Sequence, residues 1–159
     1  MEDLDAFLRW QAGPLLESRL RSAYAEWLVH RALGRDPGDH RRGDGLLSLE
    51  GGRRSLAVSS AAFLTAPHQD TPAAVSFSLE QREAHRDITA WVFCLLAEQD
   101  PLRVAPQDPN QWRFWVVPSQ RLHPDRRSIG LQPLRRAFGD GHGYGALPQL
   151  LASCSMGVR

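Results

Sequence analysis

Three acidic side chains are spaced so that they could share one metal ion. Asp44 and Glu50 flank GLLSL (45–49), which we predict to be the first strand of a hairpin, and Glu26 lies upstream in a segment with helical periodicity. Carboxylate oxygens are the ligands that Mg²⁺ prefers, and a bound metal ion can activate water for hydrolysis. Asp44 and Glu50 both fall in turns, however, where acidic side chains are usually solvated. The sequence therefore leaves open both a solvated surface and a metal site built from these carboxylates.

A serine nucleophile is a second chemistry that the residues suggest. Ser59 and Ser60 carry hydroxyl groups that His68 or His85 would have to activate as a base. Neither serine sits in the G-x-S-x-G turn that exposes a nucleophile between a strand and a helix. We therefore interpret both as strand residues with satisfied hydroxyls. The histidines show no spacing typical of a metal site, so we expect no metal and no cofactor unless the carboxylates bind Mg²⁺.

Paired arginines in loops are the candidates for holding phosphate groups. All 19 positively charged side chains are arginines, and no lysine is present, so mechanisms that need a lysine amine are excluded. Guanidinium pairs can grip phosphate, but the 18 acidic residues and the net charge of +1 equally fit a salt-bridged surface. The nucleic-acid-binding candidates are Arg41, Arg42, Arg53, Arg54, Arg126 and Arg127.

Length and composition predict one globular domain in a reducing compartment. The 159 residues are 42% hydrophobic, which is ordinary for a single domain with a sizeable core. The two cysteines are unclustered and indicate neither a disulfide framework nor a metal site. The N-terminal residues have no signal-peptide pattern, and no apolar run is long enough to span a membrane. We therefore expect a cytoplasmic protein without a membrane partner.

The elements that must position these residues alternate between helical and strand periodicity. The sequence predicts a short helix at 1–13 and a longer helix from Pro14 to about Leu33. Gly34 is expected to end the longer helix. The remaining predicted elements are two hairpin strands within 45–64, strands at 73–79, 88–97 and 112–118, a short strand and helix within 128–139, a glycine-rich hinge at 139–145 and a last helix at 146–154. The first three strands are expected to form a meander. The order predicts one α+β domain over residues 1–159, with a mixed central sheet flanked by helices.

Several blocks of this sequence occur together in a familiar order. They are YAEWLVHRALG, LAVSSAAFL, WVFCLLAEQDP, DPNQWRFWVVPSQRL and SIGLQPLRRAFG, and they lie between residues 22 and 151. Together they resemble an uncharacterised bacterial family with a restriction-endonuclease-like fold, in the PD-(D/E)xK superfamily. The resemblance implies a restriction-endonuclease-like core.

The resemblance also implies where a nuclease site should lie. In that superfamily an Asp ends one strand, and a Glu and a Lys flank one residue on the next strand. Residues two apart on a strand face the same side, so the acids converge on a metal beside the lysine. This chain has Ala57 and Ser59 in place of the Glu and the Lys, and Leu46 or Leu47 in place of the Asp. Of the wider set of site residues that the resemblance implies, Glu26 is the one that this chain retains.

The function that follows is a catalytically inactive nuclease-like protein that acts by binding. The resemblance implies nucleic acid, DNA above all, or a protein partner in DNA-related or defence processes, and homodimers are common among such folds. We expect Ala57 and Ser59 to line the vacated cleft. The alternative is an enzyme: either a Mg²⁺-dependent nuclease with relocated carboxylates at Glu26, Asp44 and Glu50, or a small-molecule enzyme that reuses the nuclease cleft.

Overall fold

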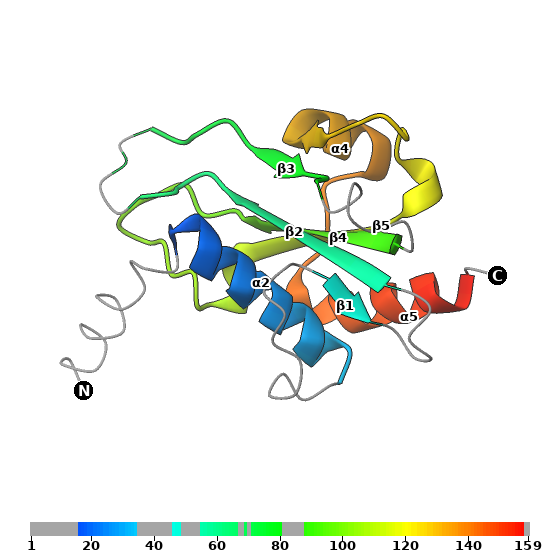
Figure 1. Ribbon diagram of the computed structural model, residues 1–159. Coiled ribbons are helices and arrows are strands. Elements are labelled where there is room, and N and C mark those ends of the chain that lie inside the picture. The colour runs from blue at the N-terminus through cyan, green and yellow to red at the C-terminus, as the bar shows by residue number, and fades with distance from the viewer. Residues whose placement is uncertain are drawn as a thin grey trace.

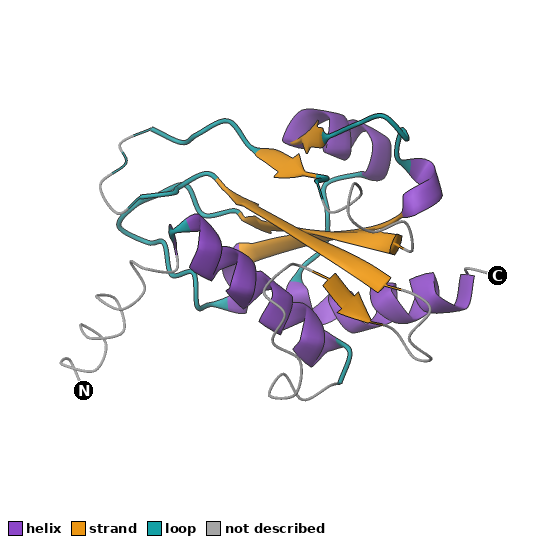
Figure 2. Ribbon diagram, in the orientation of Figure 1, coloured by secondary structure: helices purple, strands orange, loops and turns teal. Residues whose placement is uncertain are grey.

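A mixed α+β fold is built around a central mixed sheet (Figures 1 and 2). The computed structural model describes residues 16–34, 46–48, 55–66, 69, 71–80 and 88–157. The predicted helix at 1–13 and the turns that hold Asp44 and Glu50 lie outside these residues. None of the helices within them is long and apolar enough to cross a membrane.

The central sheet has the strand order β1-β2-β4-β5. Its strands are β1 (Leu46–Ser48), β2 (Ser55–Ala62), β4 (Ile88–Leu96) and β5 (Trp112–Pro118). β1 is antiparallel to β2, β2 is parallel to β4, and β4 is antiparallel to β5. The antiparallel pairing within residues 45–64 and the two later strands are therefore confirmed. The unbroken apolar run of β4 has its physical reason here, because β4 lies inside the sheet with both faces covered.

The predicted three-strand meander is wrong at its third strand. β3 (Ser76–Ser78) leaves the central sheet and pairs antiparallel with β6 (Ser128–Gly130) in a separate two-stranded sheet. Parallel strands need a crossover connection, and the chain between β2 and β4 provides it. β3 belongs to that crossover and therefore covers a face of the central sheet instead of extending its edge.

Three α-helices lie against the sheet in the described part of the chain. They are α2 (Ser18–Ala32), α4 (Leu131–Phe138) and α5 (Leu147–Gly157), and each was predicted. Glu17 caps the start of α2 by accepting hydrogen bonds from two backbone amides, and Gly34 follows its end with φ at +72°. Short 3₁₀ helices complete the fold: η2 (Pro109–Gln111), η3 (Ser119–Arg121) and η4 (Tyr144–Ala146).

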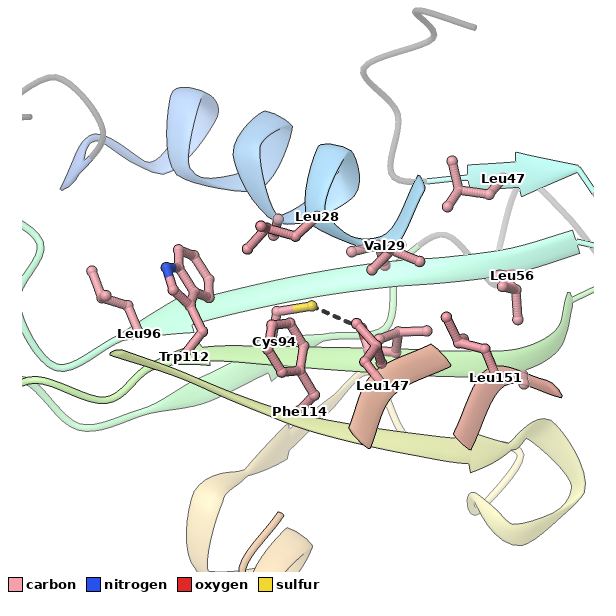
Figure 3. Packing of buried hydrophobic residues seen from close by; sticks show 14 of the residues in the cluster. Leu28, Val29, Leu47, Leu56, Cys94, Leu96, Trp112, Phe114, Leu147 and Leu151 are labelled. Carbon is pink, nitrogen blue, oxygen red and sulfur yellow. Dashed lines mark hydrogen bonds between the residues drawn. The ribbon is translucent and has the colours of Figure 1, made fainter. Parts of the chain in front are cut away.

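One face of the central sheet is covered by α2 and α5, as Figure 1 shows. Leu28 and Val29 of α2 and Leu147 and Leu151 of α5 belong to one buried cluster there, which also includes Trp112 (Figure 3). Because side chains alternate along a strand, β2 contributes every second residue to this core: Leu56, Val58 and Ala62.

The other face is covered by β3, β6 and α4 (Figure 1). Phe77, Ile129 and Leu134 form this layer, and each is at most 3% exposed. Trp115 packs here, three residues after Trp112, so the two tryptophans lie on opposite faces, as the two-residue period of a strand requires. Each face of the sheet therefore has its own apolar core.

The glycine-rich segment at 139–145 is fastened to β5. The backbone of Phe114 exchanges two hydrogen bonds with that of His142, at 2.8 and 2.9 Å. The Trp115 indole donates to the carbonyl of Gly139 at 2.9 Å, and a Cβ on Gly141 would meet the Trp115 ring at 2.8 Å. These contacts join the segment to β5, and its role as a hinge stays a prediction.

Candidate functional site

The positions that the sequence resemblance assigns to a nuclease motif lie together on one face of the central sheet. Leu46 stands directly opposite Ala57 across the antiparallel pair of β1 and β2. Ser59 lies two residues along β2, so its side chain points to the same face as that of Ala57. Leu47 faces the opposite core, with α2 and α5. Of the two leucines considered for the Asp position, Leu46 is therefore the one on the face of Ala57.

These positions are buried, and the expectation that they line an open cleft is wrong. Leu46, Ala57 and Ser59 are 7%, 0% and 5% exposed. The layer that carries β3 covers them, and Phe77 and Leu79 belong to the same apolar cluster as Ala57. The covering layer comes from residues far away in the sequence, which the pattern of β2 alone does not predict.

The hydroxyl group of Ser59 has a structural partner. It donates a hydrogen bond to the backbone carbonyl of Ser78 at 2.9 Å, and so ties β2 to β3. Ser60 faces the other side, where its hydroxyl lies 3.0 Å from that of Ser22 on α2. His68 and His85 lie outside the described residues. The geometry agrees with the interpretation of both serines as satisfied strand residues.

Glu26, the one carboxylate that the sequence resemblance retains, is on α2. This helix packs on the face opposite Ala57 and Ser59. Glu26 is 6% exposed and takes part in interactions with other groups. The structure therefore does not bring Glu26 together with the replaced motif. Asp44 and Glu50, the other two carboxylates of the relocated site, lie outside the described residues, so that site stays a prediction. Within the described ranges, no three His, Cys, Asp or Glu side chains are grouped to hold a metal ion.

Arg126 and Arg127 are the candidate phosphate-binding pair that the structure describes. Both are exposed, in the turn between η3 and β6. The backbone carbonyl of Arg127 accepts a hydrogen bond from the amide of Leu79 at 2.8 Å, which anchors this turn to the layer over β2. Arg41, Arg42, Arg53 and Arg54 lie outside the described residues, and their role stays a prediction.

Two buried polar groups could not be predicted from the sequence. Arg21 of α2 is 7% exposed, and its Nη1 donates to the carbonyl of Leu16 at 2.9 Å. Burial lowers the pKa of its guanidinium, against a smaller opposing effect of Glu17. Trp91 pairs in register with Ala57, and its buried indole N–H has no hydrogen-bond partner among the described residues. Burial depends on what covers a helix or strand, so neither residue has a signal in the sequence alone.

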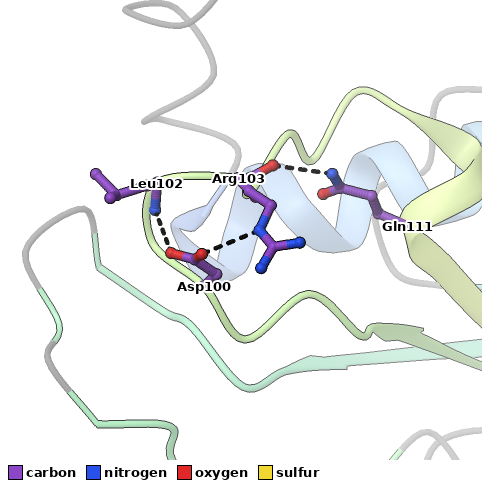
Figure 4. Close-up of polar contacts among 4 residues, drawn as sticks. All are labelled: Asp100, Leu102, Arg103 and Gln111. Atoms are coloured by element: carbon purple, nitrogen blue, oxygen red, sulfur yellow. Dashed lines mark hydrogen bonds and ion pairs between the residues drawn. The ribbon is translucent and has the colours of Figure 1, made fainter.

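A polar turn between β4 and β5 presents an exposed leucine. The carboxylate of Asp100 accepts hydrogen bonds from the backbone amide of Leu102 at 2.9 Å and from Nε of Arg103 at 3.0 Å (Figure 4). Those bonds, the backbone bond first, hold the pKa of Asp100 below its ordinary value. Gln111 fixes the other side of the turn by donating to the carbonyl of Arg103. Leu102 is 95% exposed as a result.

Comparisons of the chain with protein-family models, with curated proteins and with solved structures found no match.

Proposed function

We propose that this chain has a restriction-endonuclease-like core whose nuclease site has been replaced, and that it acts by binding nucleic acid. The observation that carries the proposal is the buried, uncharged set of Leu46, Ala57 and Ser59 on one face of the sheet. A protein partner is the other ligand class that the sequence resemblance implies, and the experiment below distinguishes the two.

The register of β1 and β2 supports the resemblance to the nuclease motif. The motif needs an acid on one strand to converge with an acid on the next, and Leu46 opposes Ala57 in that way. Neither side chain has an oxygen with which to bind a metal ion. The hydroxyl of Ser59 is engaged by the backbone of Ser78, so it does not replace the lysine as a charged group. The strand pairing is compatible with the motif, and the side chains at these positions lack its charged groups.

The rest of the chain offers no ready substitute for the missing lysine. All its basic side chains except histidine are arginines, which hold their protons too tightly to donate them at neutral pH. Replacing the acids by Leu46 and Ala57 also removes two negative charges that would repel phosphate. Binding to a polyanion therefore survives changes that abolish cleavage.

The test is a binding and cleavage assay with single-stranded and duplex DNA, with Mg²⁺ or Mn²⁺ present and the protein in excess. We expect binding that weakens as salt rises, with the DNA intact. Glu26→Ala is the matched variant, and it should leave both results unchanged. Cleavage that disappears in Glu26→Ala would instead establish a relocated metal site. Absence of DNA binding even at low salt would contradict the proposal and leave a protein partner.

A further inference from the structure

Positive charge is concentrated in the C-terminal third of the chain. Residues 112–159 carry seven arginines and two acidic residues, a net charge of +5. Residues 1–111 carry twelve arginines and sixteen acidic residues, a net charge of −4. The near-neutral total of +1 therefore hides a strong asymmetry between two parts of the sequence.

The structure places much of this charge on one side of the central sheet. Five arginines lie on η3, the turn that follows it, and α4, and we call them the arginine layer: Arg121, Arg126, Arg127, Arg135 and Arg136. Figure 1 shows α4 and the yellow segment near residue 120 together on the side opposite α2 and α5. Asp125 is the one acidic residue between the first and last members of the layer.

Three members of the layer gather at the C-terminal end of α4. The guanidinium carbon of Arg121 lies 4.8 Å from the ring centroid of Phe138, in a cation–π contact that joins η3 to α4. Arg135 precedes Phe138 by three residues, so the two are neighbours on the helix surface. Arg136 follows in the same turn and is exposed. Arg121 and Arg135 are thus both placed beside Phe138, and Arg136 adds a further positive charge to the same helix turn.

Within the described residues, no acidic side chain forms an ion pair with these three arginines, Arg121, Arg135 and Arg136. The Nε donor of Arg135 is buried and has no hydrogen-bond partner. The negative end of the helix dipole favours cations in the last turn of α4, but it does not account for Arg121 on η3. Among the described residues these guanidinium groups thus keep their positive charge unpaired, which suits them to hold an anion.

The character of the surface decides which anionic partner fits. Protein interfaces usually centre on exposed apolar or aromatic side chains, and membrane-surface helices insert an apolar face. Among the described residues the large exposed hydrophobic side chains are Leu20, Trp27 and Leu102, and none belongs to the arginine layer. A guanidinium group can donate two parallel hydrogen bonds to the oxygens of one phosphate. A nucleic-acid backbone offers a phosphate to each of several arginines.

We infer that the arginine layer is the surface on which this protein holds the phosphate backbone of nucleic acid, without reading its base sequence. The inference rests on the proposed function and adds to it the place and the chemistry of binding. Arg121, Arg135 and Arg136 form its centre, and Arg126 and Arg127 extend it toward β6.

The experiment measures fluorescence anisotropy of a labelled duplex and of a single strand of the same sequence over a series of salt concentrations. The test variant combines Arg121→Gln, Arg135→Gln and Arg136→Gln. The control combines Arg19→Gln, Arg31→Gln and Arg103→Gln, which are exposed arginines outside the layer and change the net charge equally. Circular dichroism melts of both variants check that they fold.

The layer variant should lose at least about tenfold in affinity near 0.1 M salt, and its salt slope should fall by about 2 to 3 units for three lost phosphate contacts. The control should stay close to the wild type. A variant with lysine at Arg121, Arg135 and Arg136 should keep the salt slope but bind less tightly. Lysine keeps the positive charge and lacks the paired donors of the guanidinium group.

Equal losses in the layer variant and the control would overturn the inference, because bulk charge would then explain binding. DNA binding that survives in the layer variant and disappears in Arg53→Gln/Arg54→Gln would overturn it too, and would leave the proposed function standing. If the wild type binds no DNA at low salt but binds vesicles rich in phosphatidylserine, both the inference and the proposed function fail.

Discussion

Introducing a carboxylate at Ala57 tests whether the position proposed to replace the nuclease glutamate is sealed from water. Ala57 is 0% exposed and has Phe77, Leu79 and Trp91 in its apolar cluster. The variants are Ala57→Glu and, as its matched control, Ala57→Gln, which has the same length without the charge. Both should lose about 1–3 kcal/mol of stability from overpacking, and the control isolates that part.

The charge adds a cost that depends on pH. Burial disfavours the ionised carboxylate and raises its pKa by up to about 3–5 units above the unfolded value of about 4.3. Near pH 4 the group is largely protonated in both states, so the two variants should unfold alike. Above that pH the unfolded chain loses its proton first and folding must restore it. The difference between the variants should reach about 4 kcal/mol at pH 7, since each pH unit contributes about 1.4 kcal/mol.

Urea unfolding followed by circular dichroism between pH 4 and pH 8 measures this difference. A domain of this size is typically stable by about 5–15 kcal/mol, so the expected loss is large but measurable. A hydrogen bond from the unpartnered indole of Trp91 would offset only about 1–3 kcal/mol of it. A constant difference between Ala57→Glu and Ala57→Gln across this pH range would refute the buried site and indicate a carboxylate in contact with water.

Three further predictions concern the surrounding fold. Gly141→Ala should destabilise the protein by about 1–3 kcal/mol in thermal melts, because φ is +82° and the new Cβ meets the Trp115 ring; Gly139→Ala, at φ +85° in open space, should cost less, and equal losses would refute the contact. Burial raises the pKa of the Cys94 thiol, so a thiol reagent should label Cys94 only when the protein unfolds, as mass spectrometry of the labelled peptide would show. The pKa of Asp100 is held below its ordinary value of 3.8, so its carboxylate should stabilise the turn above that pH and lose this effect as pH falls through the lowered pKa; NMR titration of the turn amides that shows an ordinary pKa would contradict the turn's hydrogen bonds.

The strands of the central sheet could be predicted because their patterns are local. The unbroken apolar run of β4 and the opposite placement of Trp112 and Trp115 both follow from the two-residue period of a strand. The partner of β3 could not be predicted, because three alternating residues indicate a strand and say nothing of which strand it meets.

The environment of the replaced motif depended on contacts that are distant in sequence. Ala57 and Ser59 were identified from their place in the motif, but their burial is caused by the layer of β3, β6 and α4. The glycines at 139–145 suggested a flexible segment, whereas the structure uses the conformational freedom of Gly141 to bring the backbone close to Trp115. The arginine layer is likewise assembled from a 3₁₀ helix, a turn and an α-helix, so the grouping of its arginines becomes evident only in the folded structure.

The most direct test of the proposed function is one sample in which binding and cleavage are read together. A labelled DNA duplex is incubated with excess protein and Mg²⁺ at low salt, its anisotropy is recorded, and the same sample is then run on a denaturing gel. The proposed function predicts high anisotropy that salt reverses, with the duplex strands at full length. Strands cut in the presence of Mg²⁺, and left intact by the metal-free protein, would contradict it.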